Sequence, residues 1–471
     1  MNKYEIVIGL EIHAELSTKT KAFCGCANEF GSAPNTNCCP VCVGFPGALP
    51  VYNRAAMEKG ILAGLAFGCE INKVSIFERK NYFYPDLAKA YQLSQLVRPT
   101  CIGGEVKLKS GKVIRLNRIH LEEDAGKLLH NDVTQKTLVD YNRSSVPLVE
   151  MVTEPDISSA AEAVEFLEEV RSRLVYAGVA DCKMEQGGMR CDVNLSLRPT
   201  GTKKFGSRTE MKNLNSFRSV ARAIEHESKR QAEVLDAGGA VTQETRKWDD
   251  TKGKTSAMRS KEEAQDYRYF PDPDLIAIKV TPAEVAAIKI KLPVLAYQLK
   301  NKFMTEFGLP EYDADVLTRE KAIAFYFLDC VKAYNSPKQI SNWIMVDLMK
   351  IMNAAGEDAP IPISAAHFTE IIKMTEDKTI TKLVGLQLLE KVISTKQSPG
   401  ELAKTMGLLV TVTEQQIVAI LEQLKAEKPT IAADYRENPE RVIRFMIGYV
   451  MKNTQGRAKS DLVEKLIKEK F

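Results

Sequence analysis

Long apolar runs are missing from this sequence. No stretch of about 18 consecutive apolar residues occurs, and a helix needs roughly that length to cross a membrane. The first residues, MNKYEIVIGLEIHAEL, lack both the apolar core of a signal peptide and the Arg- and Ser-rich composition of a transit peptide. We therefore expect an intracellular, cytoplasmic protein without membrane contact.

A large excess of one charge is missing as well. Lys and Arg total 65 against 61 Asp and Glu, so the net charge is only +4. Bulk charge therefore does not indicate a nucleic-acid binder, although a local basic face would be sufficient for one. The phosphate-binding pattern GxxxxGK[ST] is also absent, so a nucleotide would need another kind of site.

Cysteine is scarce outside one short segment. Of ten cysteines, five lie between Cys24 and Cys42, as C-x-C followed by C-x2-C. Two such pairs resemble a zinc ribbon, in which four thiolates hold a structural zinc ion. We predict this site at Cys24, Cys26, Cys39 and Cys42, although Cys38 can replace Cys39 as the third ligand. Reduced cysteines in a loop without metal are the alternative.

The periodicity of apolar residues changes along the chain. Residues 4–16 alternate as a strand does, and short alternating stretches continue to about 150 and again over 189–212. Helices are expected at 158–177 and 216–237, and helical patterns dominate after residue 295. The predicted fold class is α+β. The predicted domains are 1–295 with a zinc-ribbon-like insert near 24–42, an all-α domain at 296–405, and a small all-α tail at 406–471. KQSPGE (396–401) is predicted to be a linker.

Acidic side chains gather at four places in the β-rich half. Glu11 and His13 lie on one strand face, because alternate side chains of a strand point the same way. The other groups lie at or near the ends of predicted strands: His120, Glu122, Glu123 and Asp124; Glu150 and Glu154; Glu185 and Asp192. Neighbouring carboxylates repel one another unless a cation or water screens them. The pattern favours a shared Mg²⁺ or Mn²⁺ over the alternative of solvated polar faces.

Basic side chains accompany these acidic groups. Arg79 and Lys80 lie in FERKNYFYPDLAKAYQ, and Lys212 lies in EMKNLNS. Cationic side chains beside a metal ion suit a polyphosphate ligand. The last helices are also rich in Lys and Arg, which indicates either a phosphate-facing surface or solvated helix faces.

Several stretches together resemble the B-subunit family of the aspartyl/glutamyl-tRNA(Asn/Gln) amidotransferases. The similarity rests on these segments, in this order: IGLEIHAEL, FPGALPV, FERKNYFYPDLAKAYQ, HLEEDAGK, DYNRSSVPLVEMVTEPD, KMEQGGMRCDVNLSLRP, EMKNLNSFRSV, QETRKWD and DYRYFPDPDL. GLPEYDADVLT, SNWIMVDL and FMIGYVMKNTQGRA extend it to almost the whole chain.

This resemblance implies an ATP-dependent carbon–nitrogen ligase that uses glutamine as amido donor. Family members bind tRNA(Gln) or tRNA(Asn) wrongly charged with Glu or Asp, and phosphorylate the side-chain carboxylate with ATP and Mg²⁺. Ammonia from the amidase (A) subunit then displaces the phosphate, and a small (C) subunit stabilises the heterotrimer. The implied fold is a β-rich cradle followed by a helical domain and a helical tail that contacts tRNA.

The resemblance also implies roles for particular residues. Glu11, His13, Glu123 and Glu150 would hold the catalytic metal, and Glu185 and Asp192 are candidates for a further ion. Arg79, Lys80 and Lys212 would contact ATP phosphates or substrate. Two rival functions are a stand-alone metal-dependent ligase or kinase for a small acid, and a tRNA-binding module in which the ions serve folding only. A stand-alone ligase or kinase would not explain the helical extension. A tRNA-binding module would not explain the density of carboxylates.

Overall fold

The computed structural model describes residues 3–131, 133–260, 267–356, 359–409, 412–454 and 456–470. It divides into two compact units, residues 1–295 and 296–471. The first contains a large sheet and the second is helical, which confirms the predicted α+β class. None of the described helices is both long and apolar enough to span a membrane.

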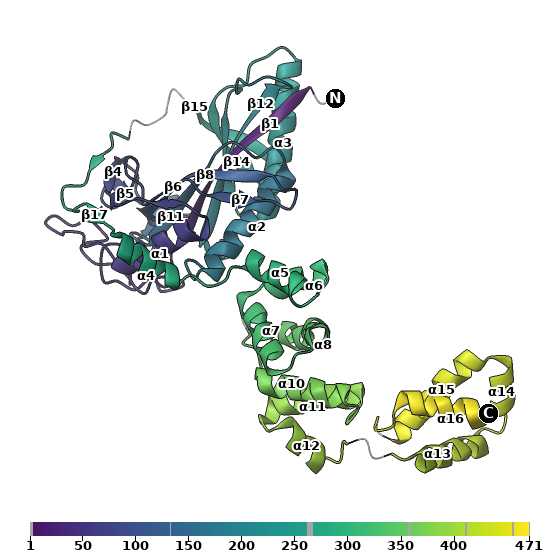
Figure 1. Cartoon of the computed structure of the whole chain (residues 1–471). Coiled ribbons are helices and arrows are strands. Elements are labelled where there is room, and N and C mark those ends of the chain that lie inside the picture. The colour runs from purple at the N-terminus through teal and green to yellow at the C-terminus, as the bar shows by residue number, and fades with distance from the viewer. Residues whose placement is uncertain are drawn as a thin grey trace. The chain divides into compact units, whose positions relative to one another are not determined.

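The first unit is built on a ten-stranded sheet (Figure 1). Its strand order is β15-β14-β13-β12-β1-β11-β8-β6-β2, and β7 pairs with β8 beside this path. The bounds are β1 Tyr4–Glu15, β2 Glu70–Ile71, β6 Cys101–Ile102, β7 Glu105–Lys107, β8 Val113–Glu123, β11 Pro147–Thr153, β12 Met189–Pro199, β13 Thr209–Leu214, β14 Glu244–Asp249 and β15 Lys254–Ser260.

Strand β1 lies in the middle of this sheet, antiparallel to both β12 and β11. Its even-numbered residues from Ile8 to Ala14 are buried, whereas Glu11 and His13 on the other face are only partly buried. The strand predicted at residues 4–16 is thus confirmed. One face of the sheet is apolar, and the other carries polar side chains at the centre.

Three helices cover the apolar face. α1 (Arg54–Ala66) packs on β8, where Gly60 lies against Leu121, and α3 (Phe217–Asp236) packs on β12 and α2 (Ala160–Tyr176). Ser159 and Ser216 cap α2 and α3 by accepting a hydrogen bond from a backbone N–H in the first turn. The two predicted helices are confirmed, and the polar face of the sheet is left for other segments.

Short strands build the remaining parts of the first unit. β4 (Glu78–Asn81) pairs with β5 (Tyr91–Ser94) and with β16 (Phe270–Pro271), and β9 (Lys127–Asn131) forms a hairpin with β10 (Lys136–Asp140). β17 (Ile278–Lys279) pairs with β3 (Val74–Ser75) and precedes α4 (Pro282–Ile290). A 3₁₀ turn, Met184–Gln186, precedes β12. The sheet of β4, β5 and β16 contributes side chains of β4 and β5 to the candidate active site.

The second unit is all-α, as predicted. Its helices are α5 Ala296–Thr305, α6 Glu311–Thr318, α7 Lys321–Ala333, α8 Pro337–Asn342, a π-helical turn Trp343–Leu348, α9 Met349–Ala355, α10 Ala365–Glu376, α11 Lys382–Thr395, α12 Pro399–Thr405, α13 Glu414–Glu427, α14 Ile431–Glu437, α15 Pro439–Asn453 and α16 Ser460–Lys470.

The structure corrects the linker expected at 396–401. Lys396 ends α11 in the left-handed conformation, and Pro399 is the first residue of α12. Proline favours the first turn of a helix, because its fixed φ suits that position and its missing N–H has no helical partner there. The connection is therefore only the short turn 396–398. A separate tail domain beginning at residue 406 stays a prediction.

Candidate active site and cysteine cluster

A row of polar side chains crosses four neighbouring strands of the central sheet. The register places Arg190 of β12 opposite His13 of β1, His13 opposite Glu150 of β11, and Glu150 opposite His120 of β8. Directly opposite residues lie on the same face of a sheet and close together. Strand pairing thus collects on one face residues that are far apart in the sequence.

His13, Glu122 and Glu150 form the first group that can hold a metal ion, with ligand atoms within 4.8 Å of one another. His13 Nε2 lies 3.4 Å from Glu150 Oε2 and 3.8 Å from Glu122 Oε2. His120 Nε2 lies between the same carboxylates, 3.2 Å from Glu122 Oε1 and 3.3 Å from Glu150 Oε2. Ser94 Oγ also donates to Glu122 Oε1 at 2.6 Å. An imidazole nitrogen and two carboxylates are ligands suited to Mg²⁺ or Mn²⁺.

The electrostatics of this group favour positive charge. Burial alone would raise the pKa of Glu150, but the facing imidazoles of His120 and His13 hold it well below its usual range. Burial likewise opposes a charged His120, yet the charge of Glu150 and the hydrogen bond to Glu122 raise the pKa of His120 to about 9. Both carboxylates are almost fully buried. A bound cation can provide the compensating charge that buried carboxylates require.

A second group, Glu11, Asp192 and Glu210, lies beside the first. Burial raises the pKa of Glu11, and so does the charge of Glu150. Lys212 Nζ already binds this group, 2.6 Å from Asp192 Oδ2 and 2.9 Å from Glu210 Oε1. The predicted residues Asp192 and Lys212 are therefore brought together, but as an ion pair.

A pocket of about 170 Å³ is bordered by Glu122 and Glu150 of the first group. It is lined by Glu11, Lys80, Ser94, Leu96, Arg118, His120, Glu122, Glu150, Val152, Tyr267 and Tyr269. The ammonium group of Lys80 lies 5.1 Å from the centre of the Tyr267 ring. Carboxylates and cations thus face one small space, an arrangement suited to a metal-assisted reaction of anions.

Glu123 lies on the opposite face of β8 from Glu122. Its carboxylate accepts hydrogen bonds from Lys89 Nζ at 2.6 Å, Ser145 Oγ at 2.6 Å and the backbone N–H of Leu93 at 3.0 Å. The structure therefore brings Glu122 to His13 and Glu150, and leaves the predicted ligand Glu123 in a separate buried ion pair. Adjacent residues of a strand point to opposite faces, which is the physical reason.

Two further predicted residues lie apart from both groups. Arg79 donates from Nε to Asp272 Oδ2 at 2.6 Å and from Nη2 to Asp274 Oδ2 at 3.1 Å, so it fastens β16 to β4. Glu185 is exposed in the 3₁₀ turn before β12. Neither residue lines the pocket.

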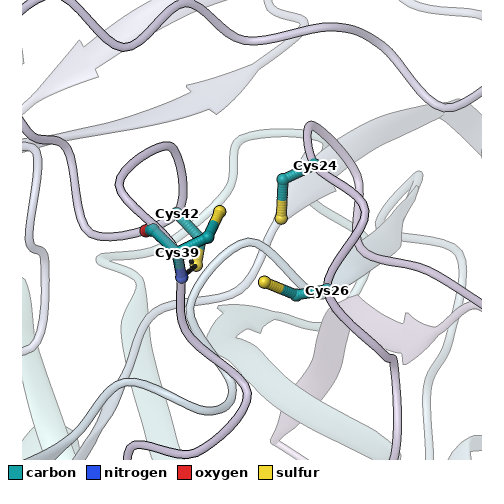
Figure 2. A group of neighbouring side chains, drawn as sticks. All are labelled: Cys24, Cys26, Cys39 and Cys42. Carbon is teal, nitrogen blue, oxygen red and sulfur yellow. Dashed lines mark hydrogen bonds between the residues drawn. The ribbon is translucent and has the colours of Figure 1, made fainter.

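The four predicted cysteines meet in one loop region. Cys24, Cys26, Cys39 and Cys42 have sulfur atoms within 4.8 Å of one another, and Figure 2 shows the two pairs facing each other. A hydrogen bond from the Cys24 thiol, aided by the backbone N–H of Cys39, lowers the pKa of Cys42 to about 4. Cys38 is outside this group, and its sulfur lies 3.8 Å from Asn142 Oδ1. The geometry thus favours Cys39 over Cys38, and the donor set fits zinc.

Sequence reasoning gave no role in the site to Arg118, His120, Glu122 or Glu210, although it placed His120 and Glu122 in an acidic group, and the phase of β8 offered a further signal. Ile119 and Leu121 are apolar and buried, so residues 118, 120 and 122 of β8 must share the other face. That phase points to Arg118 and Glu122. Glu210 had no comparable signal, because only the pairing of β13 with β12 brings it to Asp192.

Comparisons with known proteins define the class of this chain. Residues 6–286 match the model of the GatB/GatE catalytic domain, and residues 325–471 match that of the GatB domain. The chain therefore has the catalytic domain of an amidotransferase, a glutamine-dependent ligase of translation, in its first unit.

Curated relatives specify the family. The B subunit of the aspartyl/glutamyl-tRNA(Asn/Gln) amidotransferase of Caldicellulosiruptor saccharolyticus is 49% identical over 100% of this chain and 99% of its own length. The same subunit of Caldanaerobacter subterraneus is 46% identical, and that of a Thermoanaerobacter strain 45% identical, with the same coverage. The chain belongs to the family of aspartyl/glutamyl-tRNA(Asn/Gln) amidotransferase B subunits, as its resemblance indicated.

Proposed function

We propose that a misacylated tRNA is activated and amidated in the pocket bordered by Glu122 and Glu150, beside His13. The substrate is Glu-tRNA(Gln) or Asp-tRNA(Asn). A side-chain carboxylate oxygen attacks the γ-phosphorus of ATP, the bond to the bridging oxygen breaks, and ADP leaves. Ammonia then attacks the acyl carbon, loses a proton, and expels phosphate to leave Gln-tRNA(Gln) or Asn-tRNA(Asn). The observation that carries this proposal is the buried row of imidazoles and carboxylates in a pocket that also contains cations.

His13, Glu122 and Glu150 would hold Mg²⁺ or Mn²⁺ for this reaction. A bound ion would supply positive charge against the negative charge of the phosphate oxygens. His120 contacts both carboxylates and so keeps them oriented. Glu11, with Asp192 and Glu210, provides negative charge for a further ion or for ordered water.

The partners follow from the names of the relatives, which are B subunits. We expect a heterotrimer in which an amidase (A) subunit releases ammonia from glutamine, with a small (C) subunit as the third chain. The described site requires no Ser or Cys nucleophile for the steps above, so glutamine hydrolysis is assigned to the amidase. Because charged tRNA is the substrate, we place the enzyme in the cytoplasm.

Two regions outside the pocket have supporting roles in this proposal. The four cysteines hold a structural Zn²⁺, since closed four-thiolate sites leave no position for a substrate. The helical second unit contacts the tRNA, and Lys and Arg of its last helices supply positive charge.

The test is phosphate transfer from γ-labelled ATP by the complete heterotrimer. ADP and amidated tRNA are measured together for the wild type, for His13→Ala, and for His130→Ala as an exposed control on β9. We expect ADP only with misacylated tRNA and Mg²⁺, and its loss in folded His13→Ala alone. A wild-type complex that binds charged tRNA but forms no ADP would identify a recognition module instead.

A further inference from the structure

Cationic side chains around the sheet site fall into two kinds. Four of them are committed to carboxylates: Arg79 to Asp272, Lys89 to Glu123, Arg190 to Asp124, and Lys212 to Asp192. Lys80 and Arg118 differ, because both line the pocket and neither forms an ion pair with a carboxylate of the described ranges. A cation that is paired with no carboxylate in a partly closed pocket can bind an anionic ligand.

Arg118 lines the pocket from strand β8. It lies on β8 opposite Val152 of β11, on the same face as His120 and Glu122. Its Nε is buried and has no hydrogen-bond partner among the residues with described coordinates, and Nη1 donates to Asn117 Oδ1 at 3.3 Å. A buried donor without an acceptor is unfavourable, so a ligand acceptor at this position would stabilise it.

Lys80 faces the same pocket from β4. The ammonium group lies over the Tyr267 ring. Lys80 and Arg118 thus place two positive charges in the pocket that also holds Glu11, Glu122 and Glu150.

The size of the pocket limits the ligand. At about 170 Å³ it is smaller than the roughly 300–1,000 Å³ typical of sites for whole small molecules. A single phosphoryl or carboxylate group fits this space better than a complete nucleotide. Arg is suited to such groups, because its planar guanidinium can donate two parallel hydrogen bonds.

We propose that Arg118 is a substrate-binding residue, and that it completes a two-cation site for the reacting oxyanion with Lys80, whose contact with phosphate or substrate the family resemblance already implied. The oxyanion is either the phosphoryl group that is transferred or the side-chain carboxylate that receives it. This inference rests on the proposed function, because it assumes that the reaction occurs in this pocket. Its chemistry is electrostatic: both cations lower the repulsion between two anions that must come into contact.

The test compares Arg118→Gln with Arg115→Gln in the complete heterotrimer. Arg115 is a matched control on the same strand, because it is exposed and paired with Asp156 outside the pocket. Binding of a non-hydrolysable ATP analogue with Mg²⁺ is measured by calorimetry, and KM for misacylated tRNA is measured separately. Lys80→Gln, on a different strand, is a second test if Arg118→Gln does not fold.

We expect Arg118→Gln and Lys80→Gln to weaken one of these two affinities by at least about tenfold, with Arg115→Gln unchanged. Weaker binding of the ATP analogue identifies the phosphoryl group as the ligand, and a raised KM for charged tRNA identifies the carboxylate. The inference is overturned if folded Arg118→Gln matches Arg115→Gln in both measurements. The calorimetric result does not require turnover, so for the phosphoryl group it separates a failure of this inference from a failure of the proposed reaction.

Discussion

The sheet site and the cysteine cluster are both groups of potential metal ligands, but they are assembled differently. The cysteines lie in one loop between Cys24 and Cys42, whereas His13, Glu122 and Glu150 come from β1, β8 and β11. The cysteine cluster therefore depends on local spacing, and the sheet site depends on the register of three strands. A local cluster can be identified from a pattern, but a site across strands depends on the whole sheet.

Their surroundings differ as well. The carboxylates of the sheet site face imidazoles and border a pocket. Two cations of this pocket, Lys80 and Arg118, form no ion pair with a carboxylate of the described ranges. The cysteine sulfurs face one another, and Cys42 is fully buried. The first arrangement leaves room for a reactant, and the second suits a closed structural ion.

The largest effect is expected from Glu150→Gln. It removes the charge that faces both His13 and His120, so the formation of ADP should fall on the order of 10²–10³-fold, the effect of losing one strong electrostatic partner in a site. The rate is measured with saturating Mg²⁺ and charged tRNA. Glu154→Gln is the control, since Glu154 binds Asn117 outside the pocket. Equal rates for the two variants would rule out the sheet site as the place of activation.

The neighbours Glu122 and Glu123 should respond in opposite ways. Glu123→Gln leaves the buried ammonium of Lys89 without its counter-charge and should lower the free energy of unfolding by about 3–5 kcal/mol. Glu122→Gln relieves repulsion among clustered carboxylates, so it should lower turnover with little loss of stability. Urea denaturation and ADP release on both variants check this pair. The reverse pattern would show that Glu123 is the metal ligand.

The cysteine cluster should affect metal content more than chemistry. Cys42→Ser removes one of four thiolates, so we expect the zinc content of the purified complex to fall to background. The rate of ADP formation per folded complex should stay within about threefold, because closed zinc sites are structural. Cys38→Ser should retain zinc, since Cys38 lies outside the cluster. Loss of zinc in both variants, or in Cys38→Ser alone, would contradict the assignment of Cys39.

The smallest effect is expected at Asp156, the partner of the control residue Arg115. Hydrogen bonds from Arg115 lower the pKa of Asp156 below its ordinary value of 3.8. The pair therefore stabilises the fold above that ordinary value, and the contribution is lost as pH falls through the lowered pKa of the folded state. Because the pair is near the surface, Asp156→Asn should cost less than about 1 kcal/mol at pH 7. Thermal unfolding at pH 7 and pH 3 measures it, and an unchanged difference at pH 3 would refute this origin.

Much of the fold could be predicted from local patterns. The alternation in residues 4–16 placed β1, and the apolar spacing in residues 158–177 placed α2, because both signals repeat over neighbouring residues. The boundary of α12 was harder, since Pro399 can indicate either a loop or the first turn of a helix. Turns of this kind are decided by the packing of the helices that they connect.

The candidate site was predicted less evenly. His13 and Glu150 lie in one group on the polar face of the sheet, whereas Glu11, which the sequence assigned to the same metal, lies in the second group with Asp192 and Glu210. Whether Glu122 or Glu123 joins His13 and Glu150 depends on which residues of β8 face the site. Whether Lys80 or Arg79 lines the pocket depends on the position of β16, to which Arg79 is bound. The tertiary contacts of a charged side chain determine whether it pairs or stays free, and a single sequence does not contain those contacts.

The sequence by itself determined the ligand types, the four-cysteine spacing, the α+β class and the family of this chain, because all of these depend on residue identity and local order. Only the tertiary structure decided which carboxylates share a face with His13, which cations are already paired, and that Arg118 lines the pocket. The physical reason is that strand register and side-chain pairing are interactions between distant segments, and their geometry exists only in the folded sheet.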